Sequence, residues 1–173
     1  MTPQETVERA LALSKADGCV VLATERSEAN LRWASNTLTT NGSMRSREVA
    51  VVSVVGGAAA VAQRSAVTAD DLEELVRASE QAARDAGPNE DAAPLVEPDS
   101  RPDGWDEPAV ETSIGRLATV SADLGEAFAR AAGQSRLLFG YAEHAVETQY
   151  LGSSTGLRLR HVQPTGDSPA TSR

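Results

Sequence analysis

The chain has 173 residues, enough for a single domain with a sizeable core or for a domain built by internal duplication. Apolar residues make up 40% of it and aromatic residues only 3%, so alanine and valine carry most of the apolar content. Its formal net charge of -9 argues against a general nucleic-acid-binding protein, because neutralising phosphates requires clustered lysine and arginine.

The cysteine content and the lack of targeting signals indicate the cellular compartment of the protein. Cys19 is the only cysteine, which excludes an internal disulfide and a thiolate metal cluster. The first residues lack the basic start and apolar core of a signal peptide. No apolar run approaches the roughly 18 residues that span a bilayer. The sequence therefore predicts a cytoplasmic protein that makes no membrane contact.

The first predicted helix begins with a capping box. Thr2 is its N-cap, Pro3 fits the first helical position, and Glu5 sits where a carboxylate reaches back to the cap. Gly18 is a natural stop. Residues 19–24 then form a short apolar run that predicts a buried strand.

Turn signals divide the following residues. A polar turn is predicted at residues 26–28, with strands on either side of it. Asn41-Gly42 predicts a tight hairpin turn, because both residues tolerate positive φ. Residues 49–55 form a β-branched strand, and the glycine pair that follows reverses the chain into a further strand.

A second helix is predicted near residue 72. Val67 and Leu72 form a hydrophobic staple around the cap Thr68, and Asp71 occupies the capping-box position. Gly87 ends this helix.

The composition then changes. Five of the eight prolines fall between residues 88 and 108, among acidic residues and glycines. Residues 88–110 therefore form an acidic, proline-rich linker or surface excursion, which we expect Trp105 to pin locally.

Regular structure resumes in residues 111–165. A helix with Ser121 as a candidate cap stops at Gly133. Residues 137–141 and 146–151 predict paired strands, and residues 157–161 alternate as another strand. The small, polar tail, residues 166–173, is predicted to be disordered.

The two halves resemble each other, because each runs helix, glycine, apolar strand and a strand with a central aromatic residue, Trp33 or Tyr150. The predicted fold class is α+β, with two helix–strand–strand units, residues 1–87 and 111–165. These units are a candidate internal duplication, and we expect them to form a mixed sheet with helices packed on it.

A search for reactive groups gives no catalytic residue and no metal ligand set. His144 and Glu147 have a superficial metal-ligand spacing, but a strand would point them to opposite sides. His144 is interpreted as a turn residue. Ser153 lies in a turn without a GxSxG elbow, and Cys19 is interpreted as a core residue.

One local basic cluster remains, in residues 157–161. Arg158, Arg160 and His161 alternate there with Leu157 and Leu159. The cluster has two interpretations, a solvated strand face or a contact surface.

Two strings carry a resemblance to a known family. Residues 28–42 (EANLRWASNTLTTNG) and 150–161 (YLGSSTGLRLRH), with 163–166 (QPTG), resemble the N-terminal region of the TldD/TldE metallopeptidase family, also called PmbA or modulator of DNA gyrase. The likeness runs from about residue 2 to residue 166. The first string is more similar to TldE than to TldD.

The resemblance implies a non-catalytic, TldE-like domain of a cytoplasmic TldD/TldE-type zinc metallopeptidase complex that processes or degrades peptides. It implies no cofactor in this chain, because the zinc is expected in a partner TldD-like subunit. That subunit, or a second copy of this chain, is the expected partner, through a peptide or subunit contact formed by Tyr150, Leu157, Arg158, Leu159, Arg160 and His161. The alternatives are a free-standing peptide-binding module that uses strand addition and a small hydrolase that uses Ser153 or Ser154.

Overall fold

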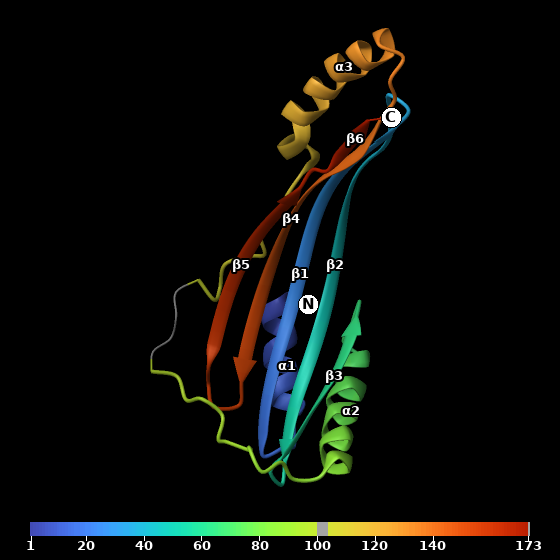
Figure 1. The fold of residues 1–173 in the computed structure, drawn as a ribbon. Coiled ribbons are helices and arrows are strands. Elements are labelled where there is room, and N and C mark those ends of the chain that lie inside the picture. Colours follow the sequence, from blue (N-terminus) through green and yellow to red (C-terminus); the bar gives the residue numbers. More distant parts are fainter. Residues whose placement is uncertain (100–103, 173) are drawn as a thin grey trace. The chain divides into compact units, whose positions relative to one another are not determined.

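The computed structural model of the protein describes residues 1–99 and 104–172, and it contains helices and one sheet (Figure 1). Its elements in chain order are α1 (Pro3–Leu13), β1 (Gly18–Ala34), β2 (Thr37–Val55), β3 (Ala58–Ser65), α2 (Asp71–Ala86), the 3-10 helix η1 (Ile114–Leu117), α3 (Ala118–Gly133), β4 (Leu138–Ser153), β5 (Arg158–Asp167) and β6 (Ala170–Ser172). Within these residues, no helix is long and apolar enough to cross a membrane.

The sheet has the strand order β3-β2-β1-β4-β5, and β6 pairs with β4 beyond the end of β5. β5 and β3 are therefore its edge strands. The structure confirms the α+β class with helices packed on the sheet, although the strands are antiparallel rather than mixed. The internal duplication stays a prediction.

The described residues divide into two compact units. The first comprises Met1–Glu25, Ser46–Ala109 and Thr148–His161, and the second comprises Arg26–Arg45, Val110–Glu147 and Val162–Arg173, of which residue 173 is not described. Both are assembled from segments far apart in the sequence, and β1, β2, β4 and β5 each contribute residues to both units.

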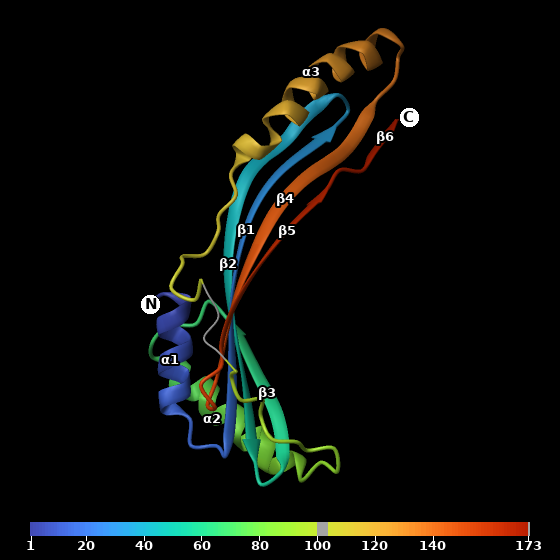
Figure 2. The ribbon, with the colours of Figure 1, turned by 90° about the vertical axis from the view of Figure 1, so that its left-hand side faces the viewer.

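In the first unit, α1 and α2 cover the same face of the strands (Figure 1, Figure 2). Its core is made of small aliphatic residues and two aromatic ones: Val7, Ala10, Cys19, Val21, Ala23, Val49, Val51, Leu72, Leu75, Val76, Trp105 and Tyr150. Because successive strand residues point to opposite faces, Ser53, which bonds Ser79 of α2 at 2.6 Å, marks the helix-covered face and Val54 the other.

The predicted start of the first helix, α1, is confirmed by its hydrogen bonds. Thr2 Oγ1 accepts from Glu5 N at 3.1 Å, and Glu5 Oε2 accepts from Thr2 N at 2.8 Å, which completes the capping box. Thr68 and Asp71 exchange the equivalent bonds, as predicted, but α2 itself begins at Asp71 with Asp70 at the N-cap position. Gly87 ends this helix with a φ of 72°. The glycine pair after β2 also reverses the chain with positive φ at both residues, as predicted.

A buried carboxylate joins α2 to the end of α1. Glu80 Oε1 accepts a hydrogen bond from Lys15 N at 2.6 Å, Arg77 Nη1 pairs with Oε2 at 2.7 Å, and Arg77 also donates to Leu13 O. Burial raises the pKa of the Glu80 carboxyl, but the bond from Lys15 and the charges of Arg77 and Arg84 outweigh burial and hold the pKa below its usual value.

In the second unit, α3 packs against β1 and β4. Leu117, Leu124 and Phe128 of the helical segment contact the buried side chains Leu31 and Trp33. The predicted end of the helix at Gly133 is confirmed, but the predicted cap at Ser121 is wrong. The helix already begins at Ala118, because η1 provides an earlier start.

The predicted polar turn at residues 26–28 is wrong, since β1 runs through it without a break. Its polar side chains are accommodated by partners from distant segments. Ser27 Oγ accepts from Thr112 N at 3.1 Å, and Arg26 bridges Glu28 and Glu143 at 3.1 and 2.8 Å. Such pairing removes the cost of burying polar groups within a strand.

The predicted turn at Asn41-Gly42 is also wrong, because both residues lie inside β2. The chain reverses earlier, at Ser35 and Asn36, whose φ values are 51° and 59°. The Asn36 side chain stabilises this turn by donating to Arg136 O at 2.9 Å and accepting from Leu138 N at 2.8 Å. Asparagine adopts positive φ more readily than most residues, and here it is also hydrogen-bonded in that conformation.

Residues 137–141 and 146–151 were expected to form two strands, but residues 138–151 lie in one continuous strand, β4 (Leu138–Ser153). His144, expected in a turn, lies inside it with Nδ1 2.7 Å from Thr112 Oγ1. Within the predicted tail, β5 continues to Asp167 and β6 pairs with Leu138–Gly140. Residues 100–103 of the predicted linker lie outside the described residues.

Candidate functional site

The residues predicted as a contact surface belong to the first unit: Tyr150 lies on β4, residues 158–161 lie on the edge strand β5, and Leu157 directly precedes β5. Alternation along β5 places Arg158 and Arg160 on one face and Leu159 and His161 on the other. Leu159 is 40% exposed and His161 is also exposed, whereas both arginines are partly buried. The sequence cluster is therefore divided between two faces of the strand.

Tyr150 is a core residue. Its side chain is fully buried, and its hydroxyl donates to Glu107 O at 2.8 Å. Its ring meets Trp105 edge to face, with centroids 5.8 Å apart and an angle of 82° between the planes. This geometry is favourable for an aromatic pair, and in this structure both the ring and the hydroxyl of Tyr150 contact residues of the first unit.

Arg158 is engaged on three sides within the first unit. Its Nε and Nη2 pair with Glu8 Oε1 and Oε2 at 2.6 and 2.8 Å, a bidentate geometry. Its Nη1 donates to Ser153 O and Leu157 O, and its guanidinium lies 5.9 Å from the centre of the Trp105 ring. The distance is compatible with a cation–π contact.

Arg160 binds Glu107 and Pro108, the second and third residues after Trp105. Its Nη1 lies 3.1 Å from Glu107 Oε2, its Nη2 donates to Pro108 O at 2.8 Å, and its guanidinium lies 5.8 Å from the centre of the Tyr150 ring. Only 11% of its side chain is exposed.

Gln4 of α1 completes this arrangement. Its Nε2 donates to Trp105 O and to Glu107 O, both at 3.0 Å. We call the four side chains of Gln4, Tyr150, Arg158 and Arg160 the Trp105 site, because together they bind residues 105–108. The prediction that Trp105 pins the acidic segment is confirmed. Gln4 and Glu8 were not predicted, because nothing local in the sequence links α1 to that segment.

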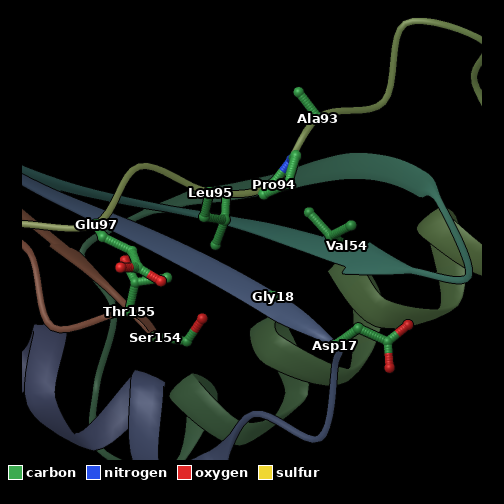
Figure 3. A pocket seen from close by; sticks show the side chains of 9 residues that line it. All are labelled: Asp17, Gly18, Val54, Ala93, Pro94, Leu95, Glu97, Ser154 and Thr155. Atoms are coloured by element: carbon green, nitrogen blue, oxygen red, sulfur yellow. The ribbon is translucent and has the colours of Figure 1, made fainter.

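A pocket of about 320 Å³ lies on the face of the first unit's strands that α1 and α2 do not cover, the face marked by Val54 (Figure 3). Residues from four segments line it: Asp17, Gly18, Val54, Ala93, Pro94, Leu95, Glu97, Ser154 and Thr155. Leu95 lies over Gly18, where an added Cβ would be 3.0 Å from Leu95 Cδ1. Thr155 Oγ1 donates to Val96 O at 2.6 Å, so the segment around Leu95 is fastened to the turn after β4.

The nucleophilic side chains of the first unit have structural partners. Burial raises the pKa of the Cys19 thiol, with a hydrogen bond to Ser14 opposing and Glu80 adding to the effect, so the unreactive protonated form is favoured. Ser153 Oγ accepts from Leu157 N at 3.2 Å, and Ser154 Oγ accepts from Cys19 N at 3.0 Å. Among residues 1–99 and 104–172, no three His, Cys, Asp or Glu side chains are grouped to hold a metal ion.

Comparison with known proteins supports a fold assignment. No family model and no curated protein matches the chain. TldE from Thermococcus kodakarensis, a solved structure, superimposes with a TM-score of 0.71 and 12% identity over 98% of this chain and 42% of that one. The chain has the fold of TldE.

Two further solved structures share the TldE fold with this chain, and both are described as candidate modulators of DNA gyrase. The protein from Bacteroides thetaiotaomicron has a TM-score of 0.67 and 12% identity, and that from Thermotoga maritima has 0.59 and 14%. Both matches cover 98% of this chain, and 43% and 42% of the other. The chain thus spans less than half the length of each of these three proteins.

Proposed function

We propose that this chain acts as a non-catalytic, TldE-like domain in a TldD/TldE-type zinc metallopeptidase complex that processes peptides in the cytoplasm. The supporting observation is the TldE fold, which extends over 98% of the chain at a TM-score of 0.71. In this proposal a TldD-like subunit carries the zinc and the reaction, and the present chain contributes a binding surface.

The surface we assign to the subunit contact is the open edge at β5, which ends the strand order. An edge strand presents backbone N–H and C=O groups that pair readily with a further strand. Leu159, at 40% exposure, lies on this strand with His161 on the same face. Because Arg158 and Arg160 bind inside the first unit, we assign the contact to Leu159, His161 and the β5 backbone.

The proposal is tested by mixing the chain with a TldD-like subunit and measuring the molar mass by light scattering. We expect a complex with the wild type, and at least a tenfold weaker one with Leu159→Lys. Val61→Lys is the matched control, because Val61 is an exposed aliphatic residue on the other edge strand, β3, with 56% exposure. If the wild-type chain forms no complex with this subunit, the proposal is refuted. If Leu159→Lys and Val61→Lys weaken the complex equally, the assignment of the contact to β5 is refuted.

The same preparations test the assignment of the chemistry. The chain alone is expected to bind no stoichiometric zinc and to leave casein uncleaved, whereas the complex is expected to cleave peptides in a chelator-sensitive manner. Chelator-sensitive cleavage by the pure chain would contradict a non-catalytic role.

The second candidate function is a free-standing module that binds a peptide by strand addition at β5. The open edge of this strand favours it, because main-chain hydrogen bonds can hold an added strand without a second subunit. Peptide binding by the isolated chain that Leu159→Lys abolishes, together with no response to the TldD-like subunit, would favour this candidate.

A further inference from the structure

Residues 105–108 are bound to the first unit in the way that a protein binds a peptide ligand. Three backbone carbonyls in a row of four residues accept hydrogen bonds from side chains: Gln4 donates to Trp105 O and Glu107 O, Tyr150 to Glu107 O, and Arg160 to Pro108 O, at 2.8 to 3.0 Å. The donors come from α1, β4 and β5, which are distant in sequence from the segment they hold.

The bound segment is neither helix nor strand. It is a turn, in which Glu107 N donates to Gly104 O at 3.1 Å and Gly104 has a φ of 85°. Surface loops generally leave their carbonyls to water. Here the carbonyls are bound by side chains, and the Trp105 side chain is only 5% exposed within the core.

Specific side-chain contacts accompany the backbone contacts. The aromatic ring of Trp105 lies against Tyr150 and beneath Arg158, and Glu107 forms an ion pair with Arg160 at 3.1 Å. An aromatic anchor in a buried position, with an acidic residue two positions later on an arginine, is a combination that gives peptide sites their selectivity.

We propose that the Trp105 site is a peptide-binding site that residues 104–109 occupy in cis, and that it accepts in trans a turn-forming acidic peptide of the pattern Gly–aromatic–acidic–Glu–Pro. Three features of that pattern match observations of the bound segment: the positive φ of Gly104, the contacts of the Trp105 ring with Tyr150 and Arg158, and the ion pair of Glu107 with Arg160. The remaining positions of the pattern follow the sequence of the cis segment. This site is separate from the β5 edge and does not depend on a peptidase partner.

Tethering decides when an external peptide can bind. A segment of the same chain is present at an effective concentration on the order of millimolar. A peptide of similar intrinsic affinity must therefore exceed that concentration to displace the cis segment, and it binds far more tightly once the cis anchor is removed.

The test uses a fluorescein-labelled peptide with the sequence of residues 104–110, GWDEPAV, and fluorescence anisotropy with the full chain. We expect Trp105→Ala to bind it at least about 100-fold more tightly than the wild type does. A peptide with alanine in place of tryptophan should lose at least tenfold in affinity for the same variant. Equal affinity for the two peptides, or no binding to a folded Trp105→Ala chain, overturns the proposal.

The role of Arg160 is tested in the same variant. Adding Arg160→Gln to Trp105→Ala should weaken peptide binding at least tenfold, because the peptide glutamate and a carbonyl lose their partner. The matched control adds Arg116→Gln, a change at an exposed arginine of η1, and should leave the affinity unchanged. Equal effects of the two arginine substitutions would overturn the assignment.

A second measurement keeps Trp105 in place, since removing a core side chain can unfold the chain. The protein has two tryptophans, so Trp33→Phe makes Trp105 the only tryptophan, and selective tryptophan excitation then reports on its environment alone. An excess of the phenylalanine peptide GFDEPAV should shift its emission to the red as Trp105 moves from the core into water, whereas GADEPAV should not. If Trp105→Ala does not fold, this measurement decides alone, and an unchanged emission at several millimolar GFDEPAV overturns the proposal.

Discussion

Replacing Gly152 by alanine probes how closely α1 packs on β4. A Cβ at position 152 would lie 2.4 Å from Val7 Cγ1 and 3.1 Å from Leu11 Cδ1. Carbon atoms in contact prefer about 3.5–4.0 Å, so Val7 must move by about 1 Å. Gly152 does not have a positive φ, so alanine meets no backbone strain there and the cost reports packing alone.

Two single substitutions and their combination separate the clash from other effects. We expect Gly152→Ala to lower the free energy of unfolding by about 1–3 kcal/mol through overpacking. Val7 is fully buried, so Val7→Ala should cost about 2–3 kcal/mol through the cavity it leaves. In the double variant the new Cβ enters that cavity, so the combined loss should fall short of the sum by about 1–2 kcal/mol.

Urea unfolding followed by far-UV circular dichroism measures all three values. Gly125→Ala is the control for the chemical change itself, because Gly125 lies on the exposed side of α3 with no atom within 4 Å of an added Cβ. It should stabilise the chain by about 0.5–1 kcal/mol. A neutral Gly152→Ala, or a double variant whose loss equals the sum, would refute this description of the contact.

Two polar contacts, at Glu80 and Asn36, give further predictions. Glu80→Ala should cost about 2–4 kcal/mol at neutral pH, because it leaves Lys15 N and Arg77 without their partner. Folding lowers the pKa of Glu80, so the stability that its carboxylate contributes is complete above the unfolded pKa of about 4.3 and is lost as pH falls through the folded pKa. The free energies of unfolding of wild type and variant, measured in urea, should therefore converge in acid. A difference that stays constant with pH would contradict this assignment. Asn36→Ala should cost about 1–3 kcal/mol and Asn36→Gly less, because glycine keeps the positive φ while both lose the side-chain bonds. Thermal unfolding measures both, and equal losses would show that φ is unimportant there.

Three local signals predicted the structure correctly, although the local signals at Asn41-Gly42 and Ser121 did not. The capping boxes at Thr2 and Thr68 and the glycine turn after β2 depend on residues within three positions of one another, and all were predictable. The resemblance of residues 28–42 and 150–161 to TldE also pointed to the fold that the superposition supports.

Two of the failures share one physical cause, which is that partners distant in sequence bind polar residues inside the fold. The polar pattern of residues 26–28 predicts a turn, but in the structure these residues form a strand because Thr112 and Glu143 bind their polar side chains. The sequence around Arg158 and Arg160 indicates a surface cluster, but in the structure Arg158 pairs with Glu8 and Arg160 binds residues 105–108. No local pattern reveals a pairing across 150 or 52 positions.

The interleaved make-up of the first unit has a consequence for synthesis on the ribosome. Its last segment, Thr148–His161, carries Tyr150 and Arg160, which contact residues 105–108. Translation at about 5–20 residues per second delivers that segment about 3–10 s after residue 109. During this interval the nascent chain has made α1, α2 and Trp105 but not Tyr150 of β4, which packs with them in the core. A chaperone can bind the apolar side chains that stay uncovered in that time.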